Sequence, residues 1–224
     1  MVVVLSNGRS GTNLILEIIS GSSFLIPSSY PEDKQLFLRD TLYIHNYLTK
    51  CDTNYIPNFN VVCRFFINNP DSKIIWTTRH PFDQAASKIF RGWKRADDAS
   101  FKGNIKDMFW AAFIYCELYK NFPGNILTIK VEDVITNIKL ETDKMCKFLG
   151  LPFEDIMLKP WERIRHEGQK ERYPRGLDTS QIDLYKNWET IYNGFFTNVC
   201  DFSINDLFEK LSSLLKVYNY KDER

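Results

Sequence analysis

The sequence lacks the features that mark several classes of protein. Its five cysteines are far apart and form no CxxC pair, so reduced thiols are favoured over a zinc site or a disulfide framework. The formal net charge is only +1, which gives no overall attraction to nucleic acid or membranes. Apolar runs are too short to span a membrane, and the start at residues 2–5 is too short for a secretory signal. We therefore expect a cytoplasmic protein, unless the chain is a domain cut from a longer membrane-anchored parent.

What is present is typical of one globular α/β domain. The 224 residues are 44% hydrophobic and 15% aromatic, which is enough for a proper core. Short apolar or β-branched runs alternate with helical patterns, and this alternation predicts a parallel β-sheet with helices on both faces. We expect strands at 2–5, 59–66, 73–79 and 126–131, and helices at 12–20, about 34–48, 80–93, 105–122, 136–150 and 204–218.

One long stretch near the C-terminal third has a different character. Residues 160–179, "PWERIRHEGQKERYPRGLDT", are polar, basic and without a clear period. A loop of this length in a compact domain usually has a function. We therefore expect a single domain over residues 1–224, with a lid or substrate loop at about 159–180.

The stretch "SNGRSGTN" at residues 6–13 joins the first expected strand to the first expected helix. Backbone N–H groups at a helix N-terminus have no intrahelical partner, and the helix dipole adds positive potential, so this loop is a candidate anion site. A Walker A loop for ATP and Mg²⁺ would end in Gly-Lys-Ser/Thr. Here Thr12 and Asn13 follow Gly11, and the basic residue, Arg9, comes earlier, which argues against that use. The alternative is a plain glycine turn with a solvated Arg9.

A second candidate anion site lies in "KIIWTTRHPFDQAASKIF" at residues 73–90. Arg79 ends an expected strand, Pro81 opens an expected helix, and Ser87 follows Arg79 by eight positions. A strand-end arginine and a helix hydroxyl can converge on one phosphate. Taken alone, however, the stretch is better explained by a surface arginine and an unrelated helical serine.

Together the two stretches resemble the sulfotransferases that use 3′-phosphoadenosine 5′-phosphosulfate (PAPS). "GRSGTN" is similar to that family's 5′-phosphosulfate loop in its arginine form, and "TRHPFDQAAS" is similar to its 3′-phosphate motif. "ILTIKVEDVITNIKLETDKMCKFLGLPF" resembles its strand, Glu-Asp turn and helix. The resemblance covers about residues 1–155 and implies a P-loop NTPase-like α/β fold. It also implies a metal-free enzyme that moves a sulfuryl group from PAPS to a hydroxyl or amine and releases 3′,5′-adenosine bisphosphate (PAP).

The resemblance implies roles for individual residues. Arg9 would contact the sulfate or its bridge to the 5′-phosphate and neutralise charge on the leaving group. Arg79 and Ser87 would hold the 3′-phosphate. The pair Arg175-Gly176 resembles a late element that closes over the 3′-phosphate, with a solvated basic loop as the alternative. The 5′-phosphate would lie on backbone N–H groups of the residues after Arg9, which are Ser10, Gly11, Thr12 and Asn13.

The acceptor hydroxyl also needs a group that takes its proton. In the family this base is a His or a Glu between the first loop and the 3′-phosphate strand. Glu32, in "SSYPEDK", lies where the arginine-loop branch, which acts on sugars and protein tyrosines, keeps its Glu, and it is our first choice. His45, in "LYIHNYL", is the second. The alternatives are a solvated acid at a helix start and a partly buried helix histidine.

Two other functions are left open by the sequence. The first is a nucleotide or nucleoside kinase with a divergent P-loop, against which the missing Walker lysine speaks. The second is a non-catalytic module of the same fold that binds a sulfated or phosphorylated ligand. The sequence does not identify the acceptor among sugars, glycans, protein side chains and small molecules, nor the oligomeric state. A nucleic acid partner is not expected.

Overall fold

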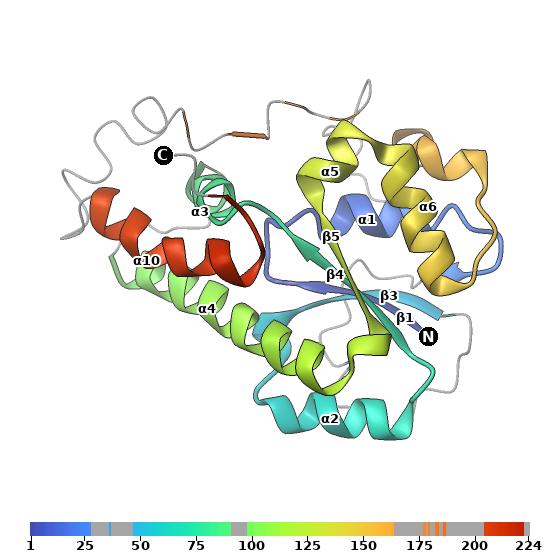
Figure 1. Cartoon of the computed structure of the whole chain (residues 1–224), viewed down its shortest axis with the longest axis horizontal. Helices are drawn as coiled ribbons and strands as arrows, with labels where there is room; N and C mark the ends of the chain where they lie inside the picture. The colour runs from blue at the N-terminus through green and yellow to red at the C-terminus, as the bar shows by residue number, and fades with distance from the viewer. Residues whose placement is uncertain are drawn as a thin grey trace.

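Five parallel strands form the centre of the molecule (Figure 1). This computed structural model describes residues 1–27, 36, 47–90, 98–163, 177, 179, 182, 183, 186 and 204–221. The order across the sheet is β2-β3-β1-β4-β5, and β1, in the middle, has an uninterrupted buried sequence, VVVLS. The strands are β1 (Val2–Ser6), β2 (Ile26–Pro27), β3 (Tyr47–Asp52), β4 (Lys73–Thr78) and β5 (Ile126–Lys130).

In the described residues, helices lie between β1 and β2, between β3 and β4, and between β4 and β5, as expected for a parallel sheet. Short 3-10 turns join some of them. The described helices are α1 (Thr12–Ile19), α2 (Phe59–Asn68), α3 (Pro81–Phe90), α4 (Asp98–Asn121), α5 (Val131–Thr136), α6 (Ile138–Leu149) and α10 (Ile204–Val217). The turns are η2 (Thr53–Tyr55), η3 (Pro123–Asn125), η4 (Asp155–Leu158) and η5 (Pro160–Arg163).

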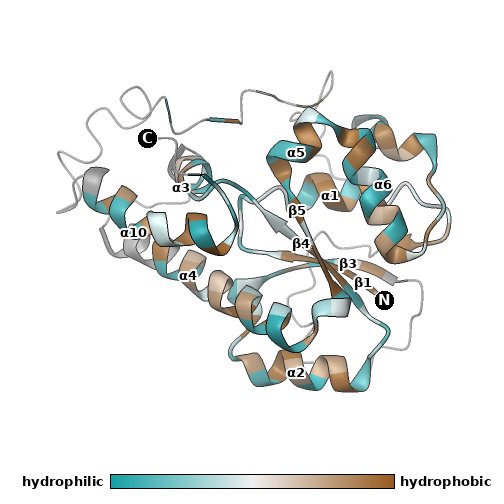
Figure 2. Ribbon diagram, viewed as in Figure 1, coloured by the Kyte–Doolittle hydropathy of each residue, from teal (hydrophilic) through white to brown (hydrophobic). Residues whose placement is uncertain are grey.

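The sheet is covered on both faces. Val2 and Val4 of β1 pack with α1, α5 and α6, whereas Val3 and Leu5 pack with α2 and α4. Because side chains alternate along a strand, the apolar run of β1 contributes to two cores at once. Figure 2 shows apolar residues along the central strands and on the helix faces turned toward them. The predicted α/β fold is therefore confirmed.

A third core lies beside the sheet, where α3, α4 and α10 meet (Figure 1). Phe82 of α3, Met108 of α4 and Leu211 of α10 are all buried in it. The amphipathic pattern of "INDLFEKLSSLLKVY" predicts α10 correctly, and the apolar face of this helix covers α3. This packing fixes the helix that carries the second candidate anion motif.

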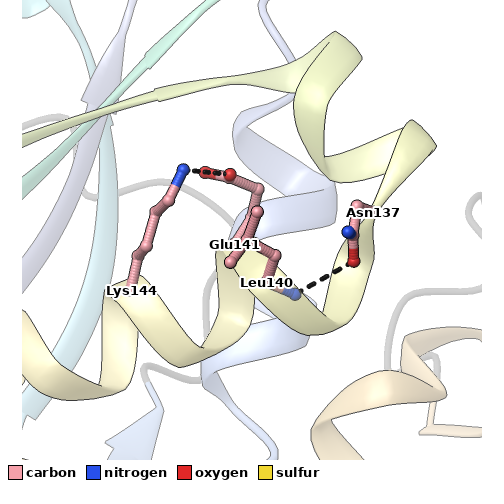
Figure 3. A network of polar contacts seen from close by, with 4 residues as sticks. All are labelled: Asn137, Leu140, Glu141 and Lys144. Atoms are coloured by element: carbon pink, nitrogen blue, oxygen red, sulfur yellow. Dashed lines mark hydrogen bonds and ion pairs between the residues drawn. The ribbon is translucent and has the colours of Figure 1, made fainter.

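Helix α6 begins with a side-chain cap, drawn in Figure 3. The Asn137 side chain accepts a hydrogen bond from the backbone N–H of Leu140 at 3.2 Å. In the next turn, the Lys144 ammonium pairs with the Glu141 carboxylate. The helix ends at Gly150, which has a left-handed backbone with φ 69°. The helix predicted at residues 136–150 is thus confirmed, and the asparagine cap and the left-handed glycine account for its two ends.

One strand prediction is wrong. "FNVVCRFF", predicted as a strand, forms helix α2. The β-branched and aromatic content favoured a strand, but the buried positions have helical spacing, which is the stronger signal. Those buried residues are Val61, Val62, Phe65 and Phe66.

One helix prediction is wrong at its end. The helix predicted to extend to about residue 48 overlaps β3, which begins at Tyr47 and lies between β2 and β1. The sequence gives little sign of this strand, because Thr49 and Lys50 are polar although both are buried. The structure shows why polar residues occur here, since this strand leads to the candidate site.

Candidate functional site

The two candidate anion motifs lie at the carboxyl ends of the central strands. The chain passes from β1 to β2 at the edge of the sheet, returns to β3 beside β1, and then crosses to β4 on the other side of β1. The strand order therefore reverses between β1 and β4, and ligands bind outside the strand ends at such a switch point. The loop at residues 7–11 follows β1 directly, and Arg79 follows β4. Both motifs thus reach the same edge of the sheet.

Two residues of the loop have left-handed backbone, Arg9 with φ 71° and Gly11 with φ 85°. At Gly11 a side chain would collide, because a Cβ there would lie 2.5 Å from Cγ2 of Val131, just after β5. At Arg9 this backbone costs about 1–2 kcal/mol. The surroundings therefore impose the conformation of Arg9, as is common at binding sites.

The loop carbonyls are held by buried polar side chains. Ser10 Oγ donates to the Asn7 carbonyl at 2.6 Å and lies 3.2 Å from Thr77 Oγ1. Gln84 of α3 donates to the Gly8 carbonyl at 2.9 Å. Because the Ser10 hydroxyl is used inside the loop, an anion would meet this residue through its backbone N–H.

The two motifs also touch each other. Arg9 Nε donates to Ser87 Oγ at 3.1 Å, although the two residues are 78 positions apart in the chain. The Arg79 guanidinium donates to the Arg9 carbonyl at 3.5 Å, and Arg79 is buried. Two guanidinium groups and a hydroxyl therefore gather beside the N-terminus of α1. Phosphate groups are bound by such sets of donors.

Two lysines that were not among the predicted site residues also contact the loop or the start of α1. Lys50 of β3 donates to Asn13 Oδ1 at 2.7 Å, and Lys88 of α3 donates to Asn7 Oδ1. Both are buried, with 9% and 2% of their surface exposed. The sequence offered one signal for Lys88, its place directly after Ser87 on a predicted helix. It offered none for Lys50, because β3 was not predicted.

Lys88 is a buried cation with carboxylates around it. Burial lowers its pKa from the ordinary value of 10.5 to about 8, and Asp52 and Asp107 partly offset this effect. Asp52 ends β3 and is paired in register with Ser6, the last residue of β1. Its Oδ1 accepts the N–H of Asn54 at 2.9 Å. The strand ends thus offer a carboxylate as well as cations.

The turn that carries Arg79 is fastened by the Glu132 carboxylate. Its Oε1 accepts the backbone N–H of His80 at 2.8 Å, and its Oε2 accepts the O–H of Tyr220 at 2.8 Å. Burial and the nearby Glu132 raise the pKa of Tyr220 well above its ordinary value. Tyr220 follows α10, so the end of the chain's last described helix is tied to the same turn. The Glu-Asp stretch thereby has a physical role, which is to position the strand end before α3.

The sequence-predicted site residues divide into two groups. One group is described and lies together around the start of α1: Arg9, Ser10, Gly11, Thr12, Asn13, Arg79 and Ser87. The other group lies outside the described residues: Glu32, His45, Arg175 and Gly176. The expected lid is described only at residues 159–163, 177 and 179. The roles assigned to both groups stay predictions.

The described ranges contain few other features of functional chemistry. In them, no three His, Cys, Asp or Glu side chains are grouped so that they could hold a metal ion. No helix within these ranges combines the length and apolar character of a membrane span. The site as described therefore consists of backbone amides, hydroxyls, cations and nearby carboxylates.

Three solved structures share this architecture. The sulfotransferase domain from the Synechococcus PCC 7002 olefin synthase superposes with a TM-score of 0.73 at 14% identity, over 99% of this chain and 95% of that domain. The sulfotransferase domain from the curacin biosynthetic pathway gives 0.66 at 15% identity, over 99% and 98%. Mouse sulfotransferase SULT7A1, solved in complex with PAP, gives 0.52 at 18% identity, over 72% and 61%.

Sequence comparison gives the family directly. A comparison with curated protein sequences found no match. The model of the sulfotransferase family, however, matches residues 29–155, which is more than half of the chain. With the fold and this match in agreement, the chain belongs to the sulfotransferase family.

Proposed function

We propose that the protein moves a sulfuryl group from PAPS to a hydroxyl or amine acceptor by in-line displacement and releases PAP. The observation that carries this proposal is the hydrogen bond of 3.1 Å between Arg9 and Ser87, beside the N-terminus of α1. PAPS bears a phosphosulfate at the 5′ position and a phosphate at the 3′ position of one ribose. It therefore needs two neighbouring sets of donors, and the contact between the two motifs supplies them.

Each end of PAPS has its own donors in this proposal. At the 5′ end, the amides of residues 10–13 bind the phosphate, and Arg9 stabilises the charge that develops as the bond from sulfur to the bridging oxygen breaks. At the 3′ end, Arg79 and Ser87 hold the second phosphate. The acceptor oxygen bonds to sulfur, the bridging oxygen leaves with PAP, and the acceptor proton passes to a protein base.

For that base we keep Glu32 as the first candidate and His45 as the second. Asp52 is a third, because its carboxylate ends β3 beside the end of β1. The variants Glu32→Gln, His45→Asn and Asp52→Asn remove a proton acceptor at nearly constant shape. Loss of the base should lower turnover by about 100-fold or more with PAP binding largely kept. Normal turnover in Glu32→Gln would remove Glu32 from this role.

The acceptor class is proposed from the arginine form of the loop. This form resembles the branch that acts on sugars and protein tyrosines, so we propose a sugar, glycan or protein side chain ahead of a simple phenol. The acceptor class is proposed by analogy with that branch, because one fold serves many functions. A panel of such acceptors with labelled PAPS tests it. Transfer to small-molecule phenols alone would contradict it.

Thermal unfolding with added nucleotides tests the nucleotide proposal. PAP at millimolar concentration should raise the Tm in the presence of EDTA, because a ligand that binds only the folded state stabilises it. Adenosine 5′-phosphate, which lacks the 3′-phosphate, should raise the Tm less. No shift with PAP would contradict the proposal, and a shift that requires ATP and Mg²⁺ would favour a kinase. PAP binding without transfer to any acceptor would favour a non-catalytic module.

A further inference from the structure

We infer that Lys88 supplies, from helix α3, the lysine that the loop lacks, and that it acts as a positioning residue for nucleotide binding through Asn7. The inference rests on the proposed function, since the nucleotide is PAPS or PAP. In a Walker A loop the lysine lies within the loop itself. Here the loop carries Arg9 instead, and a lysine reaches it from helix α3, with its Nζ bonded to Oδ1 of Asn7, which lies 81 positions earlier in the sequence.

The contact with Asn7 belongs to a closed polar cluster. Asn7 and Lys88 are both 2% exposed. Asn7 Nδ2 donates to Asn54 Oδ1 at 3.2 Å and to the Asp107 carbonyl at 3.4 Å. The Asn7 side chain is therefore bonded through both its oxygen and its nitrogen, to three different elements of the fold. Lys88 therefore contacts the first residue of the loop through the Asn7 side chain, whose orientation is fixed by its other hydrogen bonds.

Gln84 extends the same arrangement by one helical turn. It lies four residues before Lys88 on α3, so the two side chains share a helix face. Its Nε2 donates to the Gly8 carbonyl at 2.9 Å and lies 3.4 Å from the Asn7 carbonyl. In a trans peptide the N–H points opposite to the C=O, so carbonyls turned toward α3 direct the N–H groups of Gly8 and Arg9 away from it. Helix α3 thus orients the loop amides.

A charged residue at this position needs a reason, because lysine is almost never fully buried. Neutral Gln84 already forms hydrogen bonds of the same kind to the same loop. What Lys88 adds is positive charge, which is screened little by solvent when buried and therefore attracts an anion on the loop. The charged groups around it are Asp52 at the end of β3, Asp107 on α4 and Arg9, which bonds to the neighbouring Ser87.

This role has a consequence that a purely structural role would lack. An anion bound on the loop favours the charged form of Lys88, so the pKa of this lysine, about 8 in the free protein, rises on binding. At pH 8.5 the protein should therefore take up roughly half a proton or more for each PAP bound. PAP itself releases or binds almost none at this pH, because its phosphates are already ionised.

Calorimetric titration of PAP at pH 8.5, in two buffers with different ionisation enthalpies, measures this proton uptake. Wild-type protein should show it, and Lys88→Met should not. At pH 7.5 Lys88→Met should bind PAP at least about tenfold more weakly. Lys88→Arg, which keeps the charge, should restore affinity without the proton uptake. Lys120→Met, which removes an exposed lysine near the far end of α4, should behave as wild type.

The outcomes separate the two proposals. If wild-type protein binds PAP without proton uptake, or if Lys88→Met binds as tightly as wild type, Lys88 has no such role and the proposed function stands. If wild-type protein does not bind PAP, the proposed function fails, and the role of Lys88 fails with it. The measurement on wild type needs no variant to fold, so the inference can be overturned even if Lys88→Met is unstable.

Discussion

Replacing Lys88 by Met should stabilise the folded protein at neutral pH. Burial lowers the pKa of Lys88 from 10.5 to about 8, and at about 1.4 kcal/mol per pKa unit this amounts to about 3 kcal/mol. The unfolded chain binds the proton more tightly, so below pH 8 the charged lysine lowers the free energy of unfolding by this amount. As the pH rises from about 8 to 10.5, the folded state releases the proton first and the penalty disappears.

Methionine has a similar length and avoids this penalty. The change also removes the hydrogen bond to Asn7 Oδ1, which we expect to cost about 1 kcal/mol. The net gain at pH 7 is then about 2 kcal/mol, equivalent to a rise in Tm of about 5 °C for a chain of this size. If Lys88→Met is more stable than wild type but binds the nucleotide more weakly, Lys88 serves function at the expense of stability.

Urea unfolding of wild type and Lys88→Met at pH 7 and pH 9.5 measures the effect. The difference between the two free energies of unfolding should be largest at pH 7 and shrink at pH 9.5. Other titrating groups are present in both proteins and cancel from the difference. A Lys88→Met protein that is less stable than wild type at pH 7 would refute the reasoning, because Lys88 would then stabilise the fold as a charged residue.

Two further predictions concern the loop and the second motif. Arg79→Ala should weaken PAP binding by roughly 100-fold, as expected for a lost charge-assisted contact, whereas Arg64→Ala, on the exposed side of α2, should not. Titration calorimetry checks this. Gly11→Ala should destabilise the fold by about 2–4 kcal/mol, because it adds both a left-handed alanine and a collision with Val131. Gly150→Ala, with φ +69° and open space around it, should cost only about 1 kcal/mol by urea unfolding.

Each of these predictions has a clear counter-result. Equal PAP affinity in Arg79→Ala and Arg64→Ala would show that Arg79 does not bind the nucleotide. Equal losses of stability in Gly11→Ala and Gly150→Ala would show that the contact with Val131 is not important. In that case the loop would be less tightly packed against the turn after β5 than the structure indicates.

The part of the site that could be predicted from sequence depends on local patterns. The strand, glycine loop and helix around Gly11 are contiguous in the sequence, and their residue types indicate the backbone conformation of each part. The second motif, from Arg79 to Ser87, is also contiguous and contains Pro81, which opens α3. What the sequence could not give is their contact through Arg9 and Ser87, which depends on the neighbouring positions of β1 and β4 in the sheet.

The site residues that could not be predicted from the sequence are charged residues that lie in an environment unusual for their type. Lys50 and Lys88 are lysines, which a pattern places on the surface, yet both are buried against the loop. Asp52 ends a strand that was not predicted and whose first residues were assigned to the end of a helix. In each case tertiary packing brings polar side chains to the carboxyl edge of the sheet. The spacing of apolar residues does not reveal these buried polar side chains, because it depends only on which positions are apolar.

A crystal structure with PAP bound would test the central claim most directly. We expect the 5′-phosphate on the backbone N–H groups of residues 10–13, with the Arg9 side chain at its open side. We expect the 3′-phosphate on Arg79 and Ser87. PAP bound elsewhere, or bound in the reverse sense with its 3′-phosphate on the loop, would contradict the account.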